Sequence, residues 1–166
     1  MANDGADVRK WHADTARGAP QTVVRWLEAD PPLHPDVRLG ISDTGDWVVA
    51  SADGVVRFRE QVDFPGLLPL LELSLSEFQS RLHGAFSRMT FIEVNRPKFP
   101  IEQLVIYGLR AWGKHWPALA LTWASSLPQT EELAKTLTEL VVHGPTQQIR
   151  HGAKHVVFRD GGGFSS

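Results

Sequence analysis

One segment, VRLGISDTGDWVVASADGVVRFRE, constrains the fold of this chain more than any other. It contains three short runs that are rich in valine and other apolar residues, at positions 37–41, 47–51 and 55–60, and the turn-forming sequences DTGD and ADG separate them. In the last run apolar and basic residues alternate, which predicts one buried and one solvated face. The segment therefore predicts a three-stranded antiparallel β-meander that needs helices to cover it.

The segment that precedes these strands has helical spacing. In TVVRWLEA, residues 22–29, the apolar side chains Val23, Trp26 and Leu27 fall at positions i, i+3 and i+4. Three prolines in the following sequence DPPLHP would end a helix at once. We therefore predict an N-terminal helix ahead of the meander.

Beyond Asp63 the pattern changes to that of helices. The run FPGLLPLLEL is either a short helix or a buried connector, because its prolines disfavour a regular element. Thr130 is a predicted N-cap, followed by two glutamates in the first turn, with Gly144 as the stop of that helix. The predicted helices span residues 77–89, 101–112, 117–127, 131–143 and 145–159.

Together these patterns predict an α+β protein, in which an N-terminal helix and a three-stranded antiparallel β-meander pack on a C-terminal array of four to five short helices. The predicted organisation is a flexible arm over residues 1–19, an N-terminal α/β subdomain over 20–62, a helical array over 63–159 and a flexible tail over 160–166.

From Pro100 onward, short helices alternate with tight turns. The sequences EELAKTLTELV and PTQQIRHGAKHVVFR carry a pattern in which an arginine follows the first apolar residue and Gly152 and Ala153 are small enough for close helix packing. This stretch resembles the α-solenoid proteins of the HEAT kind, in which helical hairpins stack side by side. The resemblance implies a rigid scaffold that presents a face to another macromolecule, and it brings no catalytic residues.

Composition excludes several classes of function. Seventeen basic and nineteen acidic residues leave a formal charge of −2, so no global field attracts nucleic acid or an anionic membrane. The absence of cysteine removes disulfides and thiolate metal sites. No apolar run approaches the length of a membrane span, and the polar N-terminus does not look like a secretory signal, so we expect a cytoplasmic protein without a membrane partner.

The last predicted helix carries two histidines four residues apart. This spacing places His151 and His155 on one helix face, where two imidazoles can reach one metal ion. No glutamate lies between them, and the cations Arg150 and Lys154 would repel a dication. We therefore expect no metal and no other cofactor, and instead a basic face formed by Arg150, His151, Lys154, His155 and Arg159. Such cations also stabilise the end of a helix, which is the simpler explanation for them.

The sequence AWGKHW is the second candidate for an interaction surface. Trp112 and Trp116 flank Lys114 and His115 at a predicted turn between helices, and exposed tryptophan beside cations is typical of binding hot spots. The alternative is that both rings pack inward, as most of the six tryptophans are expected to do.

No nucleophile elbow, phosphate loop or dinucleotide fingerprint is present. The leading hypothesis is a non-catalytic module that binds another protein with an acidic surface, for example an immunity-type inhibitor or an adaptor. The alternatives are a small metal-assisted hydrolase, in which His143, His151 and His155 converge with a carboxylate, and a nucleic-acid binder that uses the C-terminal basic helix.

Overall fold

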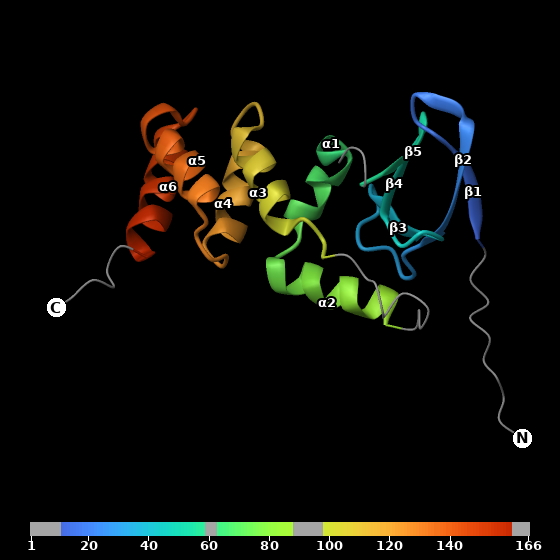
Figure 1. Ribbon diagram of the computed structural model, residues 1–166. Coiled ribbons are helices and arrows are strands. Elements are labelled where there is room, and N and C mark those ends of the chain that lie inside the picture. Colours follow the sequence, from blue (N-terminus) through green and yellow to red (C-terminus); the bar gives the residue numbers. More distant parts are fainter. Residues whose placement is uncertain (1–10, 59–62, 88–97, 161–166) are drawn as a thin grey trace, which may run out of the picture. The chain divides into compact units, whose positions relative to one another are not determined.

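The computed structural model describes residues 11–58, 63–87 and 98–160, apart from the side chain of Asp160, and divides into two compact units (Figure 1). One unit comprises Met1–Leu70 and Ser76–Phe99, and the other comprises Leu71–Leu75 and Pro100–Ser166. Parts of several predictions lie outside the described residues, namely most of the arm, the end of the third predicted strand, the end of the helix predicted over 77–89, and the tail.

The first unit is built on a closed barrel of five strands in the order β1-β2-β3-β4-β5. Neighbouring strands pair antiparallel, and β1 closes the barrel by pairing parallel with β5 through Ala16 and Val55. The strands are β1 (His12–Ala16), β2 (Ala19–Glu28), β3 (Arg38–Ser42), β4 (Trp47–Ser51) and β5 (Gly54–Arg57).

The predicted fold class is wrong, because within residues 11–58 the chain forms five strands and no helix, and the segment 22–29 predicted as a helix is part of one of them. The segment predicted as that helix forms most of β2. Its apolar spacing fits a helix, but from Val23 to Trp26 exposed and buried residues alternate, as in a strand with one face inward. The β-branched residues Thr22, Val23 and Val24 also favour a strand. The three segments predicted as strands overlap β3, β4 and β5, and the second has the same bounds as β4, but they belong to a closed barrel and not to a separate meander.

Strand β4 has buried side chains on both of its faces. Inside it, Val48 packs in a cluster with Val24, Trp26 and Val55. On the opposite face, Trp47 makes edge-to-face contacts with Phe86 and Phe99 at ring-centroid distances of 5.3 and 5.4 Å. The leucine-rich run forms α1 (Phe64–Leu67) and a 3₁₀-helix (Leu68–Glu72), and α2 (Leu75–Phe86) begins two residues before its predicted start.

The second unit contains four consecutive helices, α3 (Ile101–Arg110), α4 (His115–Ala124), α5 (Glu131–His143) and α6 (Gln147–Asp160) (Figure 1). Helix α3 packs on α4 and α5 packs on α6, and the two hairpins meet through contacts of α3 with α5 and of α4 with α6. Each helix overlaps a predicted one, but only α5 has the predicted bounds; α3 ends two residues early, α4 begins two and ends three residues early, and α6 begins two residues late. The N-cap is confirmed, since the Thr130 hydroxyl accepts a hydrogen bond from the Leu133 backbone N–H at 3.2 Å.

Half of the tryptophans are in the cores. Trp26, Trp47 and Trp123 are almost fully buried, whereas Trp11 and Trp116 are half-buried. Trp112 is 98% exposed. In the parts of the chain that the structure describes, no helix combines the length and the apolar character required to cross a bilayer.

Candidate partner-binding surface

The turn between α3 and α4 holds the most exposed aromatic ring among the described residues. Helix α3 ends at Arg110, and Gly113 has a φ of +83°, a left-handed conformation that glycine adopts without the steric cost of a Cβ. This turn leaves Trp112 outside both helices with 98% of its surface exposed. Lys114, the next charged residue, is also exposed.

The two tryptophans of AWGKHW do not behave alike. Trp116 is half-buried at the start of α4, and its ring contacts the His115 imidazole edge-on at 4.6 Å. The His115 Nε2 atom lies 3.7 Å from Glu72 Oε1, a distance that supports an ion pair when the imidazole is protonated. Of the two predicted anchors, Trp112 points outward and Trp116 packs in part against its neighbours.

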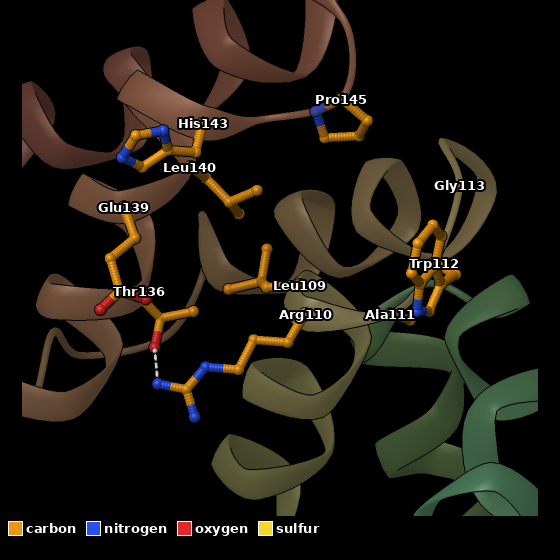
Figure 2. A pocket seen from close by; sticks show the side chains of 10 residues that line it. All are labelled: Leu109, Arg110, Ala111, Trp112, Gly113, Thr136, Glu139, Leu140, His143 and Pro145. Atoms are coloured by element: carbon orange, nitrogen blue, oxygen red, sulfur yellow. Dashed lines mark hydrogen bonds between the residues drawn. The ribbon is translucent and has the colours of Figure 1, made fainter.

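Beside Trp112 lies an open groove of about 290 Å³ between the end of α3 and helix α5 (Figure 2). Figure 2 shows Trp112 on one side of the groove and Glu139 and His143 on the other. The residues that line it are Leu109, Arg110, Ala111, Trp112, Gly113, Thr136, Glu139, Leu140, His143 and Pro145.

The floor of the groove is held by a polar contact. Arg110 donates a hydrogen bond from Nη2 to the hydroxyl oxygen of Thr136 at 3.1 Å, and its Nη1 lies 3.9 Å from Glu132 Oε1. Thr136 is almost fully buried, and its hydroxyl donates a hydrogen bond to the Glu132 carbonyl oxygen at 2.9 Å. The groove therefore combines apolar side chains with a guanidinium that is hydrogen-bonded to Thr136.

Sequence reasoning missed the groove. Of its lining residues only Trp112 was among the predicted site residues, and His143 was named only as a conceivable metal ligand. The sequence contains little that would predict a groove at Arg110 and Thr136. An arginine in the last turn of α3 and a threonine beside the leucine residues of α5 are common in helices and do not by themselves indicate a contact.

The predicted basic face lies on α6, separate in the sequence from the turn. Its buried stripe is Ile149, Ala153 and Val156, and His151, Lys154, His155 and Arg159 are exposed. Arg150 is only half-buried, and its Nη1 donates to the Gly144 carbonyl oxygen at 2.7 Å, which caps the end of α5. Arg150 therefore has a structural role that the sequence did not indicate.

The three histidines of the hydrolase hypothesis do not form one cluster with a carboxylate. His151 and His155 pair on α6, whereas His143 lines the groove. Within residues 11–58, 63–87 and 98–159, no three histidine, aspartate or glutamate side chains come together as a metal site.

A bidentate ion pair on the barrel is also structural. Arg38 donates two hydrogen bonds to the Glu28 carboxylate, at 2.9 and 3.0 Å, and these raise the pKa of the guanidinium above its usual value. Its guanidinium also lies over the Trp26 ring at 5.3 Å. A group that stays protonated throughout the physiological range cannot serve as a general acid or base there.

The fold and surface together define a two-unit protein, a small closed barrel joined to a four-helix unit with an exposed tryptophan beside a groove. Comparison of the chain with models of protein families, with curated proteins and with solved structures gave no match. Its function must therefore be inferred from its own residues.

Proposed function

We propose that the chain is a non-catalytic module that binds another protein, with Trp112 as the principal anchor and the adjoining groove as the seat for a segment of the partner. The observation that carries the proposal is the 98% exposure of Trp112. Tryptophan is strongly enriched among the few residues that dominate binding energy, and burying such a ring removes roughly 150–250 Å² of surface from water.

The charges near the turn indicate the chemistry of the partner. No acidic residue occurs between Glu102 and Glu131, a stretch that contains both Arg110 and Lys114. Arg110 lies 3.9 Å from Glu132, and Glu139 also lines the groove, so the groove itself carries both signs of charge. Lys114 is exposed close to Trp112 in the sequence. A partner that places an apolar side chain in the groove and a carboxylate beside Lys114 would match both features, so we assign a partner with an acidic surface.

Within this function the chain could act as an inhibitor of the immunity type or as an adaptor. We propose that it acts in the cytoplasm. The two subclasses differ in outcome, since an inhibitor abolishes its partner's activity and an adaptor preserves it.

The test begins with capture of partners by the tagged chain from a native lysate, with parallel arms that contain a chelator or a nuclease. The captured protein is then purified, and its affinity is measured for the wild-type chain, for Trp112→Ala and for Val23→Ala. Val23 is the matched control, because it is also an exposed apolar residue but lies on β2 of the barrel unit.

We expect Trp112→Ala to weaken binding at least tenfold and Val23→Ala to leave it unchanged. Because Trp112 makes almost no buried contact, its removal should not alter the stability of the fold. Equal affinity of the wild-type chain and Trp112→Ala would reject the proposed anchor. Loss of the captured material after nuclease treatment would instead favour the nucleic-acid hypothesis.

A further inference from the structure

The imidazole rings of the two histidines of α6 face each other on the surface. The Nε2 atoms of His151 and His155 lie 2.9 Å apart, and their rings are nearly perpendicular at 88°. Both side chains are exposed. Only one of two facing nitrogens can donate the proton of such a hydrogen bond, so the other presents an unprotonated lone pair.

Two imidazoles four residues apart on one helix face can bind the same metal ion through their Nε2 atoms. Imidazole nitrogen suits Cu(II), Ni(II) and Zn(II), and the affinity of a nitrogen site for these divalent ions is generally highest for Cu(II). We propose that His151 and His155 form a surface site for a divalent transition metal that binds Cu(II) most tightly. The imidazole that donates the hydrogen bond then carries its proton on Nδ1, so that both Nε2 atoms offer a lone pair to the ion.

One of the neighbouring cations is directed to a backbone acceptor. Arg150 donates from its guanidinium to the Gly144 carbonyl oxygen at 2.7 Å. The Lys154 ammonium lies 6.0 Å from the centroid of the Phe158 ring, and Lys154 and Arg159 are exposed. The repulsion of a dication therefore comes mainly from Lys154 and Arg159, and salt in the buffer screens it because both groups are at the surface.

The protein supplies two ligands and leaves the other positions open. Among the described side chains no third histidine, aspartate or glutamate joins the pair. Water fills the remaining positions in the isolated chain. A site of this kind binds reversibly, and it also stabilises the middle of α6, since one ion then bridges residues four apart on the same helix face.

The experiment is calorimetric titration of the untagged full-length chain with Ni(II), Cu(II) and Zn(II) salts. The variants are His151→Ala and His155→Ala, and the control is His83→Ala, which removes an exposed histidine from a different helix. We expect one equivalent of Ni(II) or Cu(II) to bind, each α6 variant to bind at least tenfold more weakly, and the control to match the wild type. We also expect Cu(II) to bind more tightly than Ni(II) or Zn(II).

A second readout reports the ligands themselves. Electron paramagnetic resonance of the Cu(II) complex should show two equivalent nitrogen ligands in the wild type and in His83→Ala, and a different spectrum in either α6 variant. Hydrogen exchange of the α6 amides should slow on addition of Ni(II) in the wild type and in His83→Ala, but not in either α6 variant. Unchanged affinity and an unchanged spectrum in His151→Ala or His155→Ala would overturn the proposal. Neither outcome depends on whether the chain binds a protein through Trp112.

Discussion

Trp26 of β2 lies directly against Gly40 of β3, and the contact leaves no space for a side chain at residue 40. A Cβ built there would come 2.8 Å from Cζ3 of the Trp26 ring and would collide with the Leu27 carbonyl oxygen. Trp26 is fully buried, and Gly40 pairs with Glu28 two residues further along β2. The absence of a Cβ at Gly40 is thus what lets the largest side chain of the barrel core lie flat on the neighbouring strand.

We predict that Gly40→Ala destabilises the barrel unit by about 1–3 kcal/mol or more, because the methyl group must displace both a packed ring and a backbone oxygen. Gly84→Ala is the matched control, since Gly84 lies in α2 of the same unit and a Cβ there meets nothing within 4 Å. That control should be neutral or more stable by up to about 1 kcal/mol, as alanine favours a helix. The midpoint of urea denaturation, compared with that of the wild type, measures the stability of each variant. Equal midpoints for the two variants would contradict the proposed close packing.

The same contact explains why the N-terminal part of the fold was mispredicted. A short apolar run such as TVVRWLEA fits helical and strand spacing equally well, and only a partner strand decides between them. Trp26 finds that partner in β3, which lies beyond the proline-rich segment. The C-terminal helices were predictable because their apolar spacing is long and their caps, such as Thr130, are local signals.

Strand β1 was missed because its inward side chains are mostly polar. His12, Asp14 and Ala16 alternate with exposed residues, but only Ala16 is apolar. The reason these residues point inward is Trp26, whose ring stacks with His12 at 4.9 Å and whose Nε1 donates to Asp14 Oδ2 at 2.7 Å. Such a strand has no hydrophobic pattern to read, since a hydrogen bond and a ring contact replace apolar burial.

We predict that Asp14→Ala destabilises the barrel unit by about 1–3 kcal/mol, because it leaves the buried Trp26 Nε1–H without its acceptor. Asp14→Asn keeps a side-chain oxygen and should cost less. Thr15→Ala is the control, because Thr15 is the exposed neighbour on the same strand, and its change should stay within about 0.5 kcal/mol. Urea denaturation gives the order of stability. A result in which Asp14→Ala and Thr15→Ala are equally stable would show that the hydrogen bond does not hold β1.

The sequence predicted the candidate surface only at Trp112, where the exposure of one residue follows from its own position at a turn. Trp112 was identified because it lies at a turn beside a lysine, and the structure exposes it. The groove depends on contacts between helices that are distant in sequence, such as Arg110 with Thr136, and spacing within one helix cannot reveal them. The orientation of Arg150 toward Gly144 is a similar case, since the same arginine could equally have faced solvent.

Thr130 joins two helices of the second unit as well as capping one. Its hydroxyl accepts from the Leu133 N–H at 3.2 Å and donates to Glu102 Oε1 at 2.7 Å, so a single side chain ties the start of α5 to the first turn of α3. We predict that Thr130→Ala lowers the stability of the helical unit by about 1–2 kcal/mol, because an orphaned N–H and an interhelical hydrogen bond are lost together.

Thr130→Ser should retain most of this stability, since serine supplies the same hydroxyl. Thr138→Ala is the control on the same helix, because the exposed Thr138 hydroxyl donates only to the Ala134 carbonyl oxygen, at 2.8 Å, and alanine has the higher helix propensity. Hydrogen exchange of the α5 amides and urea denaturation followed by tryptophan fluorescence measure these effects. If Thr130→Ala left the exchange of the first-turn amides of α5 unchanged, the cap would not stabilise this helix, and the order of α5 would have to come from the packing of its leucine ridge alone.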